Sequence, residues 1–117
     1  MVTVDAELVF KALGDGTRLR MFALLKESEL CVSEIEGGLS LSQPNASRHL
    51  AVLKNAGVIE MRRSAQKTYC KISTEFVKSY PFLLRELNMI SDALPSSNAD
   101  RIALQQYRSS RRVAYRF

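Results

Sequence analysis

The sequence predicts a mainly α-helical domain with one small β-hairpin, in the order helix, helix, helix, helix, strand, strand, helix. Three observations support this fold class: a capped amphipathic helix over residues 41–57, two β-branched segments directly after it, and apolar residues that recur every three or four positions over residues 76–94. A length of 117 residues with 46% hydrophobic content suits one core rather than two. We therefore expect one domain over residues 1–95, followed by a basic tail over residues 96–117.

Two short helices are expected before the central segment. Apolar residues recur at helical spacing over residues 4–13, and either Asp15 or Thr17 can cap a second helix. Residues 29–32 fit either a short extended segment or the opening of a third helix, which is expected to stop at the glycine pair 37–38. The second helix is assigned a structural role, because its apolar stripe suits a core.

The central helix is expected to have one face for the core and one for a partner. Ser42 or Asn45 can accept a hydrogen bond from an unpaired backbone N–H at its start, and Gly57 suits the left-handed residue that ends a helix. At about 100° of rotation per residue, Arg48 and Asn55 project away from the apolar stripe. The stripe itself consists of Ala46, Leu50 and Leu53.

A basic β-hairpin follows the central helix. Residues 58–63 and 67–72 predict two strands, with a tip at residues 64–66. Between positions 43 and 71 the chain carries six basic side chains against Glu60 alone, whereas residues 1–42 are acidic overall. Charge of this kind fits a solvated surface, but beside an amphipathic helix it favours binding to the phosphates of nucleic acid.

The last predicted helix carries a regular apolar seam. Pro81 does not suit a helix interior, so we expect a turn over residues 74–79, a helix that starts near Ser79 or Tyr80, and a stop around Pro95. Such a stripe can pack on its own domain, but in a small domain it more often completes its burial against a second subunit. The seam consists of Phe76, Tyr80, Leu83, Leu87, Ile90 and Leu94.

The C-terminal tail is rich in arginine. A short helix is expected over residues 99–107, with Ile102 and Leu104 as too small an apolar anchor, and the last ten residues are expected to be mobile. The tail fits either a solubilising segment or a basic arm on DNA.

Composition and motifs exclude several classes of protein. No apolar stretch approaches the ~18 residues of a membrane span, and the chain starts without a basic-then-apolar signal segment, so a cytoplasmic protein without membrane contact is expected. Two cysteines, Cys31 and Cys70, are too few for a disulfide scaffold. No nucleophile–base set, phosphate-binding glycine loop or metal quartet is present, so we do not expect an enzyme.

The order of elements is that of a winged helix-turn-helix domain, in which the hairpin is the wing. Four segments occur in the order typical of one family: Ala12–Arg20, Glu29–Val32, Leu41–Leu50 and Leu53–Val58. Through them the chain resembles, over about residues 5–94, the ArsR/SmtB family of bacterial transcriptional repressors. The resemblance implies a homodimer that binds a pseudo-palindromic operator on double-stranded DNA, with half-sites about one helical turn apart.

The resemblance also implies which residues bind. The first and last helices would form the dimer interface, through Leu8, Tyr80, Leu83, Leu87, Ile90 and Leu94. On the recognition helix the expected DNA contacts are Gln43, Asn45, Ser47, Arg48 and His49, with packing as the alternative for His49. Arg48 can reach a guanine edge or a phosphate. The wing can reach the minor groove or the phosphates through Arg62, Arg63 and Lys67.

The sensing residues depart from the family pattern. Thiol-dependent members have Cys-Val-Cys where this chain has Cys31-Val32-Ser33, and residues 75–94 contain no histidine that could serve a zinc site. No cofactor is therefore assigned, and arsenic or a soft metal at Cys31 stays an option. The strand before the third helix can also pair with the second hairpin strand, which would bring Cys31 near Cys70 as a two-thiol site; two inert buried cysteines are the alternative.

These expectations lead to one principal function. The chain is expected to be a sequence-specific repressor that a thiol-reactive inducer, such as an arsenical, a soft metal or an oxidant, releases from DNA. The alternatives are a winged-helix module that binds protein and a regulator of the same family without metal or thiol sensing.

Overall fold

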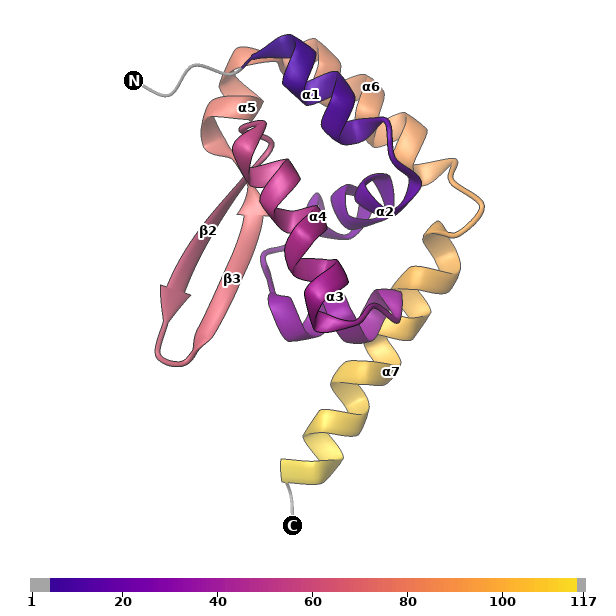
Figure 1. Cartoon of the computed structure of the whole chain (residues 1–117). Helices are drawn as coiled ribbons and strands as arrows, with labels where there is room; N and C mark the ends of the chain where they lie inside the picture. The colour runs from indigo at the N-terminus through magenta and orange to yellow at the C-terminus, as the bar shows by residue number, and fades with distance from the viewer. Residues whose placement is uncertain (1–4, 116–117) are drawn as a thin grey trace.

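Seven helices and a three-stranded sheet make up the part of the chain that the computed structural model describes, residues 5–115, with side chains over residues 5–110. The mainly helical fold with a hairpin wing confirms the predicted fold class (Figure 1). The helices are α1 (Ala6–Leu13), α2 (Gly16–Leu25), α3 (Val32–Leu39), α4 (Gln43–Asn55), α5 (Thr74–Ser79), α6 (Pro81–Asp92) and α7 (Ser97–Tyr115). The strands are β1 (Leu30–Cys31), β2 (Ile59–Ser64) and β3 (Lys67–Ile72).

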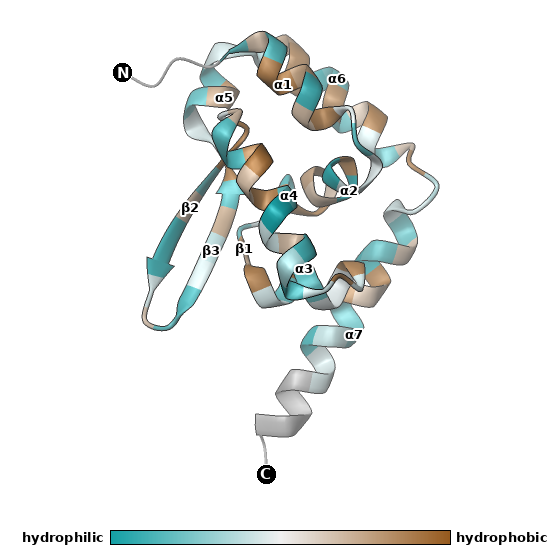
Figure 2. Ribbon diagram, viewed as in Figure 1, coloured by the Kyte–Doolittle hydropathy of each residue, from teal (hydrophilic) through white to brown (hydrophobic). Residues whose placement is uncertain are grey.

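The core forms where α1–α4 meet the base of the wing. Side chains from every one of these elements are buried there. The ring of Phe76, from α5, meets the ring of Phe22 edge to face, with centroids 6.5 Å apart. Hydropathy changes along the wing, because the base of β2 is apolar and its far end is hydrophilic (Figure 2). The wing therefore projects from the core into solvent.

Local signals in the sequence fix most helix ends. Asp15 caps α2 and Ser42 caps α4, each through its side-chain oxygen, and Gly57 adopts the left-handed φ of 78° just after α4. Residues 30–31 take the extended alternative and pair with β3, so the sheet order is β1-β3-β2. No helix among the described residues is both long and apolar enough to cross a membrane.

Two segments differ from the expected local structure. Residues 74–79 form the helix α5 rather than a turn, because Ser73 caps its N-terminus and Phe76 is buried in the core. Helix α3 continues through the glycine pair 37–38 and ends at Leu39, since Ser40 takes the left-handed conformation that closes the helix. Glycine lowers helix propensity, but packing of this face outweighs that preference.

Helix α7 is longer and better anchored than the sequence indicated. It covers residues 97–115 rather than 99–107, and it lies along α3 and continues past it (Figure 1). Leu104 is buried against Gly38, and the ring of Tyr107 lies over Gly37. The two glycines therefore supply the apolar contact surface that Ile102 and Leu104 alone do not. Residues 116 and 117 of the expected mobile end lie outside the described residues.

Candidate nucleic-acid interface

Helix α4 presents a polar face to solvent. Ala46, Leu50 and Leu53 are fully buried, so the rest of the helix surface is turned outward. Ser42 Oγ accepts a hydrogen bond from the Asn45 backbone N–H at 3.3 Å, which satisfies one of the unpaired donors at the helix start. The exposed residues of the helix are Gln43, Pro44, Ser47, Arg48, Ala51, Val52, Lys54 and Asn55.

Arg48 is exposed and oriented by a neighbour. Its Nη2 donates a hydrogen bond to Asn45 Oδ1 at 2.7 Å, within one turn of the helix. Asn45 itself is partly buried. The remaining N–H groups of Arg48 stay available for an acceptor such as a guanine edge or a phosphate oxygen.

His49 packs against the start of α2. Its side chain is only 15% exposed, and Arg18 Nη1 lies 3.0 Å from His49 Nδ1. Arg18 in turn donates from Nε to the Ala12 carbonyl at 2.6 Å, and Asp15 Oδ1 lies 3.9 Å from the ring nitrogen. The backbone N–H of Arg18 lowers the pKa of Asp15, which keeps this carboxylate ionised. The structure thus shows the packing that the sequence offered as one alternative for His49, and a DNA contact by this residue stays a prediction.

The three wing cations that were expected to contact DNA have different surroundings. Arg62 donates two hydrogen bonds to Glu29, at 3.1 and 2.7 Å, and its guanidinium lies 4.7 Å from the centroid of the Tyr69 ring. Arg63 and Lys67 are exposed and have no ion-pair or hydrogen-bond partner among the side chains that the structure describes. Arg63 and Lys67 are thus free for phosphates, whereas Arg62 would first have to leave Glu29.

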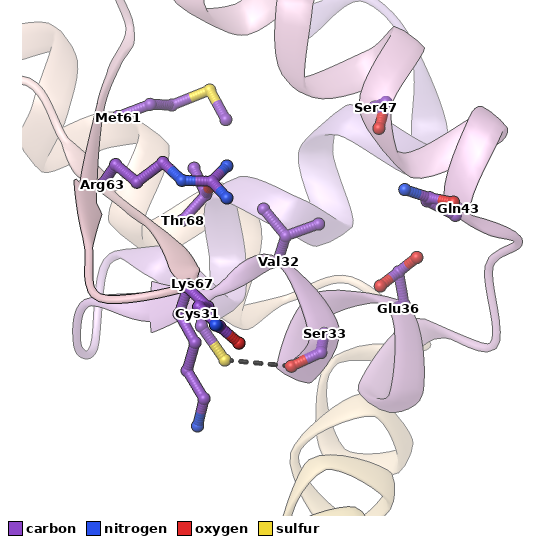
Figure 3. Close-up of a pocket in the computed structure, with 11 residues that line it drawn as sticks. Cys31, Val32, Ser33, Glu36, Gln43, Ser47, Met61, Arg63, Lys67 and Thr68 are labelled. Carbon is purple, nitrogen blue, oxygen red and sulfur yellow. Dashed lines mark hydrogen bonds between the residues drawn. The ribbon is translucent and has the colours of Figure 1, made fainter.

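A hollow separates the wing from the helix-turn-helix. Its volume is about 620 Å³, and it is lined by α3, α4 and both wing strands (Figure 3). Arg63 extends into it from the wing, and Gln43 and Glu36 lie on the opposite wall. Two predicted DNA contacts, Gln43 and Ser47, therefore share one hollow with the two free wing cations.

The two thiols have opposite orientations. In the β1–β3 ladder Cys31 is paired with Tyr69 and Leu30 with Cys70, so the two cysteines point to different faces of the sheet. Both are free thiols. Burial, with a smaller contribution from Cys31, raises the pKa of Cys70 to about 11. Cys31 lines the hollow, is 6% exposed, and its Sγ lies 3.1 Å from Ser33 Oγ.

The Cys31–Cys70 pair is adjacent in the sheet, as the strand pairing suggested, but does not present both sulfurs to one ion in this conformation. Among the described residues no group of three or more His, Cys, Asp or Glu side chains could hold a metal.

Exposed apolar side chains gather on α1 and α6, which lie at the same end of the molecule (Figure 1). Of the expected interface residues, Leu8 and Ile90 are 45% and 52% exposed, whereas Leu87 is buried within the domain. Tyr80, Leu83 and Leu94 are partly buried. The seam is thus divided between the core and the surface. Sequence reasoning missed the most exposed members of this surface, Phe10, Phe82 and Met89, which lie off the regular seam.

This arrangement defines a class of protein. A capped helix with a polar outer face, a preceding helix joined to it by a short turn and a basic hairpin beside it are the parts of a winged helix-turn-helix DNA-binding domain. The sequence profile of the family described as "bacterial regulatory protein, arsR family" matches residues 15–61.

Relatives extend this match over more of the chain. The transcriptional activator HlyU of Vibrio cholerae is 35% identical over 85 residues, which cover 73% of this chain and 79% of HlyU. The arsenic resistance transcriptional regulator ArsR1 of Pseudomonas putida is 49% identical over 69 residues, which cover 58% of this chain but only 54% of that relative. The chain belongs to the ArsR family of transcriptional regulators.

Solved structures agree with this assignment. HlyU from Vibrio cholerae matches with a TM-score of 0.61 and 35% identity, over 70% of this chain and 89% of that one. The homodimeric winged helix-turn-helix DNA-binding domain of a possible ArsR-family regulator from Mycobacterium bovis matches with a TM-score of 0.61 and 32% identity, over 69% of this chain and 75% of that one.

Proposed function

We propose that this chain is a homodimeric repressor that reads a two-fold symmetric DNA site through Arg48. The observation that supports the proposal is the position of this side chain. It is exposed on the outer face of α4, and its Nη2 donates a hydrogen bond to Asn45 Oδ1 at 2.7 Å. A guanidinium can donate two hydrogen bonds to guanine O6 and N7, which distinguishes guanine from the other bases in the major groove. Arg63 and Lys67 would add contacts to phosphate, which carry affinity and no sequence information.

Selection of binding sites from a random duplex library tests the proposal. The full chain should enrich a two-fold symmetric motif with half-sites about 10 base pairs apart, and its affinity should fall steeply as salt rises. Arg48→Ala should lose about 1–3 kcal/mol of discrimination at one position of each half-site. Lys78→Ala is the control, because Lys78 is an exposed cation on α5 and belongs neither to α4 nor to the wing strands.

If Arg48→Ala discriminates every position of the selected motif as well as the unsubstituted chain does, Arg48 is not the residue that reads the sequence. No enrichment and no salt dependence would favour the alternative of a protein-interaction module.

The second subunit is proposed to cover the apolar surface of α1 and α6. Phe82, Met89 and Ile90 are 82%, 60% and 52% exposed on α6, and a single chain leaves this area in water. Phe82→Glu combined with Ile90→Glu should therefore give a monomer in sedimentation velocity. Ile102→Glu, which alters an exposed apolar residue on α7, should leave the dimer intact. A dimer that persists in the double variant would place the interface elsewhere.

For the inducer we propose Cys31 as the responsive thiol. It lies next to the hollow between α3, α4 and the wing, whereas Cys70 is fully buried and its raised pKa keeps it protonated. Arsenite, cadmium and a mild oxidant should each be tested for release of the selected DNA site. Release that is lost in Cys31→Ser and kept in Cys70→Ser supports this assignment. Insensitivity to all three reagents would leave a regulator without metal or thiol sensing.

A further inference from the structure

The hollow between α3, α4 and the wing has a positive wall and a negative wall. Arg63 extends into it from β2, with Thr68 of β3 beside it (Figure 3). Across the hollow lie the carboxylate of Glu36 on α3 and the amide of Gln43 at the start of α4. Val32 lies between the two walls. The volume of about 620 Å³ falls within the range of ligand pockets, which is about 300–1,000 Å³.

The charged groups of the two walls are not used within the chain. Most other described arginines are paired: Arg20 with Asp100 on α7, Arg62 with Glu29 before β1, and Arg101 with Asp92. Arg63 and Glu36 have no such partner among the described side chains. An unpaired guanidinium can hold a carboxylate through two parallel hydrogen bonds, and an unpaired carboxylate can accept from an ammonium group.

The DNA backbone is a poor occupant of this hollow as a whole. A phosphate could approach Arg63 and Lys67 from the outside of the wing, but further in it would meet Glu36, whose negative charge repels it. A molecule with a negative end and a positive end satisfies both walls at once. Gln43, Ser47 and Thr68 add neutral hydrogen-bonding groups, which suit the polar atoms of such a molecule.

We propose that the hollow is a binding site for a small zwitterionic molecule, whose carboxylate binds Arg63 and whose ammonium group binds Glu36. Its occupancy competes with DNA, because Arg63, Gln43 and Ser47 then face the ligand instead of the DNA. This competition rests on the proposed DNA-binding function, whereas the binding of the ligand does not.

The test compares two molecules with the same five-carbon diacid skeleton, L-glutamate, which has an amino group, and glutarate, which has none. Each is titrated into the ¹⁵N-labelled full chain without DNA, with the ionic strength held constant by NaCl. L-glutamate should cause saturable shifts in the amide signals of residues 32–36, 43–47 and 61–68. It should bind at least fivefold more tightly than glutarate.

Two charge-removing variants separate the two walls. Arg63→Gln should weaken both ligands at least fivefold, and Glu36→Gln should abolish the preference for L-glutamate. Lys78→Gln and Glu75→Gln, which remove exposed charges from α5, are the matched controls and should change neither affinity.

Several results would overturn the proposal. They are shifts that do not saturate, shifts equal to those caused by NaCl, equal affinity for the two ligands, or binding that survives Arg63→Gln. The wild-type selection for DNA sites is measured without ligand, so a failure of the DNA-binding proposal is seen separately. If the ligand binds but does not weaken DNA binding by the wild-type chain, the competition is refuted while the site remains.

Discussion

Substitution of Gly37 by alanine tests how α7 is held. A Cβ at this position would lie 2.2 Å from Cδ2, 2.5 Å from Cε2 and 2.6 Å from Cγ of Tyr107. These atoms belong to the ring close to its attachment, so the whole ring has to move and not only the end of a flexible chain. Overpacking of this kind costs about 1–3 kcal/mol. Alanine gains back at most ~1 kcal/mol of helix propensity.

The expected net effect of Gly37→Ala is a loss of about 1 kcal/mol of unfolding free energy. In a Tyr107→Ala background the ring is gone, so the same substitution should stabilise the chain by up to ~1 kcal/mol. The double-mutant cycle should therefore give a coupling energy of about 2 kcal/mol between the two positions. Urea unfolding of the full chain, followed by circular dichroism at fixed protein concentration, measures all four corners of the cycle.

Gly16→Ala is the matched control. Nothing lies within 4 Å of a Cβ built at Gly16, so alanine should be neutral or stabilising there in both backgrounds. If Gly37→Ala destabilises the chain equally with and without Tyr107, or has no effect in either case, α7 does not pack on α3 through this contact.

Four further outcomes follow from single contacts. Asp100→Asn weakens a bidentate ion pair with Arg20 of α2 and should cost about 1–3 kcal/mol in urea unfolding, whereas a change below 0.5 kcal/mol would show that the pair is dispensable. Cys70 should resist iodoacetamide at pH 8 in the native chain, since its raised pKa of about 11 leaves little thiolate; rapid native labelling, followed by mass spectrometry, would contradict this. Arg62→Ala should reduce DNA affinity less than Arg63→Ala, because Arg62 is engaged with Glu29; the reverse order in a filter-binding assay would refute this. The pKa of Glu34 is lowered: burial raises it, but hydrogen bonds from the Cys31 backbone N–H and from Arg108 outweigh burial. Its contribution to stability is present above its ordinary pKa of 4.5 and is lost as pH falls through the lower pKa of the folded state, so Glu34→Gln should flatten the fall in stability at acid pH.

The predictions that succeeded from sequence depend on neighbours along the chain. The Ser42 cap, the left-handed Gly57 and the apolar stripe of α4 each involve residues no more than one or two turns apart. Hydrogen bonds and side-chain faces at that range follow from helix geometry alone. For this reason the recognition helix and the exposed position of Arg48 were predictable from the chain itself.

The surroundings of individual side chains were not predictable in this way. Arg62 is bonded to Glu29, 33 positions away, and His49 to Arg18, 31 positions away. Sequence charge counts treat every wing cation alike, so they could not separate the engaged Arg62 from the free Arg63. A search for acidic residues on β1 or before it, once that strand is paired with β3, would have identified Glu29 as a partner.

Helix α7 shows the same limit on a larger scale. Its sequence has few apolar residues, and Gly37 and Gly38 looked like a helix stop. When α7 lies along α3, Tyr107 and Leu104 occupy the space that a Cβ atom would fill at Gly37 and Gly38. The role of the two glycines is therefore visible only in the packed structure. Close approach of two helices depends on small residues on one side and large ones on the other, which no single segment reveals.

The sequence by itself determined the class of this protein, because caps, apolar periodicity and a run of basic residues are local properties that specify a winged helix-turn-helix domain. The tertiary structure decided which of its charges are free. Ion pairs form between side chains that the fold brings together from distant positions. They engage Arg62, Arg20 and Arg101 and leave Arg63 exposed for a partner.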